Sequence, residues 1–239
     1  MKQLRPFLIF VIVLNSCTSE FKPATFETIS IEESFEADIT AMYNKASGNS
    51  DLGNTINSTI EKAIINTLST PENNEVIKEA LNDFNSDYIK FKKDFPEESE
   101  PVWELHIETE KTFQSEEVIT IAISTYEFKG GAHGNDKIIF LNLDAKSGRV
   151  LNQKDIIENE ADFKKLAQSH FINALEAEVK NLKIEDFFFG KPFQLPENIG
   201  FTDDGLVLLY NVYEVASFEQ GYTEFVIPFE EIESYLKVN

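Results

Sequence analysis

The spacing of the apolar residues changes near residue 100, and this change constrains the fold more than any other feature of the sequence. Before it, apolar residues recur at intervals of three and four, which predicts amphipathic helices over about 51–68 and 72–91. After it, apolar and polar residues alternate, as they do in strands with one buried face. The predicted strands are 103–107, 118–128 and 138–143. Because the helices are grouped and do not separate successive strands, the sequence predicts an α+β fold with mainly antiparallel sheets and helices grouped on one side.

The second half of the chain has a similar order of elements without a sequence repeat. A helix is predicted over 161–182, and Asp203-Asp204-Gly205 is typical of a tight turn between two strands. The two carboxylates can also bind a cation, but the turn is the favoured interpretation. One strand ends near Gly130 and the next begins without a linker. We therefore predict two closely packed subdomains, at 26–129 and 130–239.

The first residues have the features of an export signal. Lys2 and Arg5 precede an unbroken run of eight apolar residues, 7–14. This run is shorter than the roughly 20 residues that a membrane-spanning helix needs, and it has the length of a signal-peptide core. The segment Leu14-Asn15-Ser16-Cys17 that follows resembles the bacterial lipobox. We therefore predict a signal peptide at 1–16, a lipid on Cys17 and a polar tether at 17–25.

Cysteine content and charge limit what the folded part can do. Cys17 is the only cysteine, so no intrachain disulfide forms and the fold depends on its hydrophobic core. The formal net charge is −21 at pH 7. This disfavours nucleic acid as a partner, because phosphate binding needs a basic surface. The charge is compatible with a basic protein partner, and also with a surface that is simply well solvated.

Residues 126–135 resemble a motif of a bacterial extracytoplasmic family. The segment Tyr126-Glu127-Phe128-Lys129-Gly130-Gly131-Ala132-His133-Gly134-Asn135 is similar to its Y-x-x-x-G-G-A-H-G-N signature. Further segments resemble other family motifs in the same order: Gly48-Asn49, Asn142-Leu143-Asp144, Lys146-Ser147-Gly148, Asp155-Ile156 and 201–206. The family includes the extracellular region of RsiV-type anti-sigma factors and the accessory region of PdaC-type peptidoglycan deacetylases. The resemblance covers about 26–236 and implies a PdaC-like subdomain followed by an RsiV-like one.

This resemblance implies binding rather than catalysis. The anti-sigma relatives bind lysozyme with the corresponding region. In the deacetylases, catalysis belongs to a separate domain that we do not expect in this chain. No motif identifies the lysozyme-contacting residues, so none is carried over to this sequence.

The glycine-rich segment is the best candidate for a ligand site. Its glycines allow a ligand to approach the backbone closely, and His133 can act as a base, a metal ligand or a pH switch. The alternative, which we favour, is that the glycines supply the positive φ of a bend while His133 bonds nearby backbone. The candidate ligand-binding residues are Tyr126, Gly130, Gly131, His133 and Asn135.

Common catalytic and metal-binding patterns are missing from the sequence. His106 and His170 each stand alone, and neither H-x-x-x-H, H-E-x-x-H nor G-x-S-x-G occurs. We therefore expect no metal and no cofactor. The sequence predicts a non-catalytic lipoprotein of the cell envelope that binds a basic, lysozyme-like protein or a peptidoglycan-related glycan. The alternatives are an envelope hydrolase or deacetylase that uses His133, and an assembly lipoprotein without a ligand.

Overall fold

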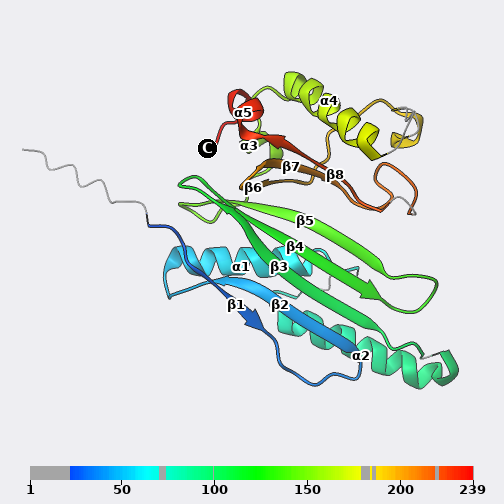
Figure 1. Cartoon of the computed structure of the whole chain (residues 1–239). Helices are drawn as coiled ribbons and strands as arrows, with labels where there is room; N and C mark the ends of the chain where they lie inside the picture. The colour runs from blue at the N-terminus through cyan, green and yellow to red at the C-terminus, as the bar shows by residue number, and fades with distance from the viewer. Residues whose placement is uncertain are drawn as a thin grey trace, which may run out of the picture.

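The structure, a computed structural model, describes residues 22–69, 74–98, 100–178, 184, 187–218 and 221–238. The predicted signal peptide, Cys17 and most of the predicted tether lie outside these residues. The described chain folds into two sheets with helices packed on them, which confirms the predicted α+β class (Figure 1). In Figure 1 the two sheets lie next to each other. Helices α1 and α2 lie on the side of the first sheet that faces away from the second sheet, and α4 lies on the side of the second sheet that faces away from the first.

The first sheet contains five strands in chain order. They are β1 (Phe26–Ser30), β2 (Asp38–Ala46), β3 (Glu104–Gln114), β4 (Val118–Phe128) and β5 (Asn135–Asp144). Neighbouring strands are antiparallel except β2 and β3, which are parallel because two helices connect them. The sequence pattern does not predict β2, since the small Ala41 weakens the apolar alternation between Ile39 and Tyr43.

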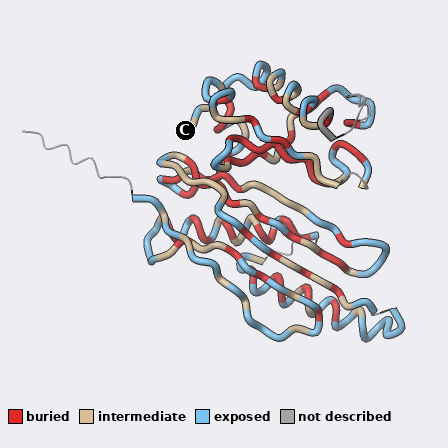
Figure 2. Tube along the Cα trace, in the orientation of Figure 1, coloured by how far each residue is buried: buried red, intermediate tan, exposed pale blue. Residues whose placement is uncertain are grey.

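Helices α1 (Asp51–Ile65) and α2 (Ile77–Asp94) cover one face of this sheet. Helix α1 begins where the Ser50 hydroxyl oxygen accepts a hydrogen bond from the Gly53 N–H at 3.0 Å. The predicted apolar stripes are buried between the helices and the sheet (Figure 2). Their buried side chains include Ile56, Ile60, Ile64, Leu81 and Tyr88, which belong to one core with Leu105 and Ile121. Both predicted helices are confirmed, although α2 spans 77–94 instead of 72–91.

The second sheet contains β6 (Ile199–Thr202), β7 (Gly205–Tyr210) and β8 (Thr223–Pro228), all antiparallel. Helix α4 (Glu160–Glu178) packs against β8. It corresponds to the helix predicted at 161–182, of which 179–182 lie outside the described residues. The short helices α3 (Gln153–Ile156) and α5 (Phe229–Ile232) flank this unit, and single 3₁₀ turns occur at Pro96–Glu98, Phe188–Gly190 and Glu233–Tyr235. The predicted Asp203-Asp204 turn joins β6 to β7.

The end of the first sheet does not coincide with the predicted division near Gly130. Strand β5 follows this residue and pairs with β4 from Asn135 to Asp144. A division between residues 129 and 130 therefore cuts between two paired strands of one sheet. The chain leaves the first sheet only after β5, where a turn and α3 lead to the second unit.

Candidate functional site

The glycine-rich segment is an exposed turn between β4 and β5. Gly130 and Gly131 have φ values of 86° and 100°, a region that favours glycine, and a side chain at either position would meet no other atom within 4 Å. The His133 Nδ1 lies 2.8 Å from the carbonyl oxygen of Gly134, and its ring stacks on Phe218 at 4.1 Å between centroids. The glycines thus provide the bend, and His133 bonds nearby backbone and contacts the second subdomain.

Tyr126 belongs to a row of side chains that crosses the first sheet. Its ring lies directly over Gly134, where a Cβ atom would overlap the ring. It also stacks on His106, with 5.7 Å between ring centroids and 9° between the planes. The His106 Nδ1 in turn lies 2.8 Å from the Thr40 hydroxyl oxygen. Burial, together with the carboxylates of Glu104 and Asp136, raises the pKa of the Tyr126 hydroxyl.

Acidic side chains surround this row on the sheet face opposite α1 and α2. The strand register places five carboxylates on that face: Asp38, Glu104, Glu108, Glu110 and Asp136. His106, Tyr126, Met42 and Ser124 share the face with them, and no lysine or arginine occupies its register positions. We call this region the open face. Met42 is 45% exposed on the open face. Strand β6 of the second subdomain contacts β3, β4 and β5 of the same sheet.

Asparagine side chains join the second subdomain to the free edge of β5. The Asn211 Oδ1 accepts from the Ile138 N–H and its Nδ2 donates to the Ile138 carbonyl oxygen, both at 2.9 Å. The Asn198 Oδ1 accepts from the Phe140 N–H at 2.7 Å. The Nδ2 of Asn142, a buried residue of β5, donates to the Ile199 carbonyl oxygen at 2.7 Å. These amides replace a neighbouring strand and protect the edge from other chains.

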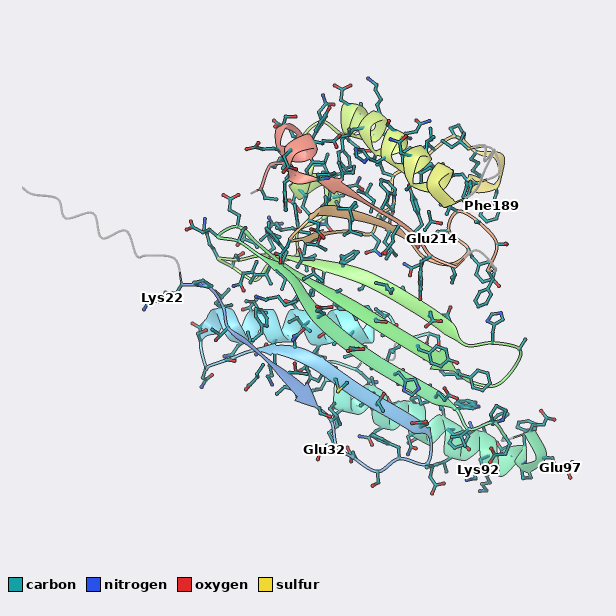
Figure 3. The ribbon with its side chains drawn as sticks, in the orientation of Figure 1. Lys22, Glu32, Lys92, Glu97, Phe189 and Glu214 are labelled. Atoms are coloured by element: carbon teal, nitrogen blue, oxygen red, sulfur yellow. The ribbon has the colours of Figure 1, made fainter. Side chains whose placement is uncertain are left out.

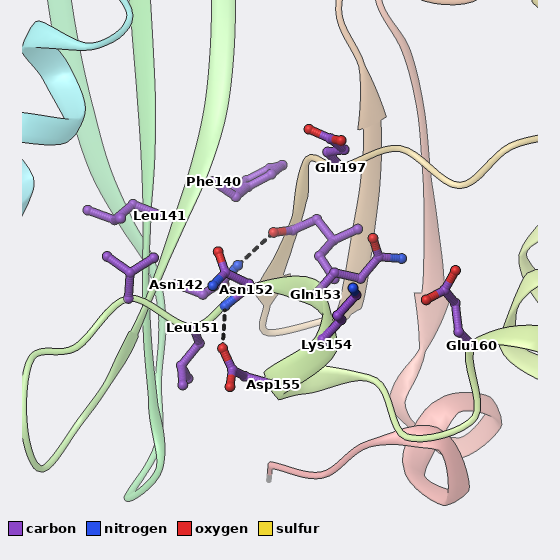
Figure 4. Close-up of a pocket in the computed structure, with 12 residues that line it drawn as sticks. Phe140, Leu141, Asn142, Leu151, Asn152, Gln153, Lys154, Asp155, Glu160 and Glu197 are labelled. Carbon is purple, nitrogen blue, oxygen red and sulfur yellow. Dashed lines mark hydrogen bonds between the residues drawn. The ribbon is translucent and has the colours of Figure 1, made fainter.

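A cavity of about 740 Å³ lies where β5 meets the second subdomain, and we call it the junction cavity (Figure 4). Its volume is in the range of small-molecule sites, roughly 300–1,000 Å³. The Nε2 atom of Gln153 is shielded from solvent and has no hydrogen-bond partner in the described part of the chain. The polar residues that line the cavity are Asn142, Asn152, Gln153, Lys154, Asp155, Glu160 and Glu197.

Glu197 also lines a smaller hollow of about 220 Å³, together with Tyr210 and Glu214. Burial raises the pKa of the Glu214 carboxyl group, and the Glu197 carboxylate adds to this rise. Glu214 and the exposed Phe189 lie at the same end of the second subdomain (Figure 3). Glu197 therefore stands between the two hollows.

The remaining candidates from the sequence do not come together. His170 is on α4, where its Nε2 lies 3.1 Å from a carboxylate oxygen of Glu231. Within the described ranges, no group of three or more histidine, cysteine, aspartate or glutamate side chains has an arrangement that could hold a metal ion. No described helix combines the length and the apolar character needed to cross a bilayer.

The sequence reasoning missed the junction cavity. One signal was present, because Asn142 is a polar residue in the otherwise apolar strand 138–143. Its partner Ile199 lies 57 positions later, however, and Gln153 and Glu197 come from different segments. No local pattern brings these residues together, so only the packing of the two subdomains reveals the cavity.

Comparisons with known proteins agree with the order of the two subdomains. Residues 30–136 match the family described as deacetylase PdaC, and residues 150–230 match a family described as a protein of unknown function, DUF3298. No curated protein matches the chain.

Two solved structures share the fold. One is a DUF3298 family member from Bacteroides fragilis, 22% identical with a TM-score of 0.68, covering 89% of this chain and 93% of the other. The second is a DUF3298 family protein from Pseudomonas aeruginosa, 20% identical with a TM-score of 0.64, covering 90% of this chain and 95% of the other. The two family models thus match this chain in tandem, the PdaC model first and the DUF3298 model after it.

Proposed function

We propose that this protein is a non-catalytic binding protein of the bacterial cell envelope that docks a basic protein on its open face. The observation that carries the proposal is the composition of that face, where five carboxylates surround Tyr126 and His106 without a lysine or arginine among them. Opposite charges accelerate encounter and favour basic partners over acidic ones. The stacked Tyr126–His106 pair adds a flat aromatic surface of the kind that anchors protein interfaces.

His133 gives the enzyme alternative no support. Its Nδ1 is held by the Gly134 carbonyl oxygen and its ring is covered on one side by Phe218. It is not among the residues that line the junction cavity. A general base must lie within hydrogen-bond reach of the proton that it removes, and His133 lines neither of the two hollows described above.

The open face can be tested with hen egg-white lysozyme as a basic probe. We expect the triple variant Glu104→Gln, Glu108→Gln, Asp136→Asn to bind it at least about tenfold more weakly at moderate salt, because charged pairs across an interface contribute more than the roughly 1.4 kcal/mol that tenfold represents. Surface plasmon resonance measures this change.

The matched control also removes three negative charges, but from α2 on the opposite side of the sheet, with Glu79→Gln, Asp87→Asn and Asp94→Asn, all exposed in the structure. This control should bind lysozyme within about threefold of the parent chain, since distant exposed charges are screened. Equal losses in both triple variants would show that only net charge matters, and absence of binding by the parent chain would remove this partner class.

The proposed location depends on Cys17. In bacteria grown with an alkyne-labelled fatty acid, we expect the parent chain to carry the label and to sediment with membranes, because acyl chains contribute roughly 0.8 kcal/mol per buried methylene. Cys17→Ala should lose the label and most of the membrane association. Ser19→Ala, a nearby change that leaves the cysteine in place, should behave like the parent. Equal labelling of the Cys17→Ala chain would exclude the proposed anchor.

A further inference from the structure

The two outer edges of the first sheet are completed differently. At β5, the side-chain amides of Asn198 and Asn211 bond the backbone of Ile138 and Phe140, so the second subdomain takes the place of a further strand. Strand β1 forms the other edge, and β2 is its one neighbour in the sheet. In the part of the chain that the structure describes, no side chain bonds the backbone of β1 in this way.

Alternate residues of β1 direct their backbone groups away from the sheet. The Ile31 N–H donates to the Ala41 carbonyl oxygen at 3.0 Å, and the Ser47 N–H donates to the Thr25 carbonyl oxygen at 2.7 Å. The odd-numbered residues of β1 therefore bond β2, and the even-numbered residues point outward, because this direction alternates along an antiparallel pair. The outward-facing residues are Phe26, Thr28 and Ser30. Their N–H and carbonyl groups have no hydrogen-bond partner among the described residues.

Strand β1 lacks the features that usually protect an edge from other chains. These are lysine, proline, a bulge or a covering segment. Its sequence, FETIS, contains neither lysine nor proline, and its pairing with β2 has no register shift. Thr28 and Ser30 are exposed, and Phe26 and Ile29 are only half-buried against the core. An added strand would find free donors and acceptors, and apolar surface to cover, along roughly 17 Å of β1.

The charge along this edge favours a basic partner. Residues 26–44, which form β1, the following loop and most of β2, contain five acidic residues and no lysine or arginine. Two of the five, Glu33 and Glu36, form ion pairs of 3.3 Å with lysines of α2. Glu27 and Glu32 are exposed and form no ion pair within the described ranges, although Glu27 lies opposite Lys45 in the register. A second copy of this chain would bring the same acidic residues to the edge, so self-pairing is disfavoured.

We propose that β1 binds an extended basic segment of a partner protein as a sixth strand of the first sheet. Backbone hydrogen bonds supply the affinity in this mode of binding, and alternate side chains supply the specificity. On one face, apolar side chains of the segment would cover Phe26. On the other face, its lysine or arginine side chains would lie beside Glu27.

This edge borders the open face, since Ser30 lies opposite Met42 in the register. One basic partner can therefore use both surfaces. The assignment of β1 does not depend on the open face, because it rests on the backbone groups of β1 and on the acidic residues around them.

The test uses the ¹⁵N-labelled full chain and the peptide acetyl-KVTVKVK-amide, whose lysines and valines lie on opposite faces when it is extended. Unbonded surface amides exchange quickly with solvent. At saturating peptide, we therefore expect hydrogen exchange of the Thr28 and Ser30 amides to slow at least about tenfold. The Ile29 amide, which already points toward β2, should change much less. The acidic peptide acetyl-EVTVEVE-amide should have no effect.

Two matched changes test the backbone hydrogen bonds. Thr28→Pro removes one outward donor without breaking a bond to β2, because proline is tolerated where the N–H of an edge strand faces solvent. It should weaken peptide binding at least about tenfold, whereas Thr28→Val keeps the N–H and should bind within about twofold of the parent chain. Methylation of all internal backbone amides of the peptide keeps its charges and should abolish binding. This second change leaves the protein unaltered, so it tests the bonds even if Thr28→Pro lowers the thermal unfolding temperature.

Four results would overturn the proposal. The basic peptide might slow no exchange on β1, or the acidic or methylated peptide might bind as well as the basic one. Thr28→Pro and Thr28→Val might bind the peptide equally. Protection of Thr28 and Ser30 that grows with protein concentration, without peptide, would show that a second copy occupies the edge. Lysozyme binding by the open-face variants is measured separately, so failure of one proposal does not hide failure of the other.

Discussion

Asn57→Leu should lower the free energy of unfolding by about 2–4 kcal/mol, because it leaves two buried backbone groups unpaired. The Asn57 Oδ1 accepts from the Ala46 N–H at 2.7 Å, and its Nδ2 donates to the Ala46 carbonyl oxygen at 3.1 Å. The register of β2 with β3 extends only to Met42, so no strand reaches Ala46 on that side. The amide of α1 therefore substitutes for the missing strand, and leucine has a similar volume without either hydrogen bond.

Urea unfolding followed by circular dichroism measures this loss. Asn54→Leu is the matched control, because it makes the same change on the same helix at an exposed position. Within the described part of the chain, its side chain makes only one hydrogen bond, a long one of 3.4 Å to Asn49. We expect this control to change stability by less than about 0.5 kcal/mol. Similar losses in the two variants would contradict the role assigned to Asn57.

Gly200→Ala should lower the free energy of unfolding by about 2–3 kcal/mol through overpacking between the two subdomains. Gly200 is buried in β6, and a Cβ atom there would overlap the ring of Phe140 on β5. Neither strand can move freely, because Asn142 and Asn198 bond their backbones across the same contact. Glycine is therefore required here for close approach and not for an unusual φ.

A double-mutant cycle in urea tests this explanation. Phe140→Ala removes the ring that blocks the new methyl group, so the double variant Phe140→Ala, Gly200→Ala should be about as stable as Phe140→Ala alone. The interaction energy would then be about 2 kcal/mol, well above the limit of additivity for independent sites. Additive losses would instead mean that alanine disturbs β6 without involving Phe140.

The elements with strong local patterns could be predicted from the sequence. The stripe of Ile56, Ile60 and Ile64 predicted α1, and the alternation around Ile121 predicted β4. An element with one buried face repeats its apolar residues with the period of a helix or of a strand. Strand β2 has the same alternation in a weaker form, with Ala41 in place of a large apolar residue. It becomes a strand through its parallel pairing with β3, which lies about sixty positions away along the chain (Asp38↔Glu104).

Some features of the candidate site could also be predicted from the sequence, and others could not. Glycine adopts positive φ without a steric penalty, so the run of glycines predicted a bend between strands, and Gly130 and Gly131 do have positive φ. The stacking of Tyr126 on His106 depends on the register of β3 with β4, and the contact of His133 with Phe218 depends on the second subdomain. The sequence identified the segment, but it did not identify the residues that this segment would meet.

The sequence by itself determined the α+β class, the order of the two regions and most of the helices and strands, because these depend on the local spacing of apolar residues. The tertiary structure alone decided how the strand edges are completed. Side-chain amides of Asn57, Asn198 and Asn211 bond backbone groups that no strand reaches on that side. The physical reason is that a polar group's partner is set by packing between distant segments, which no local pattern of residues encodes.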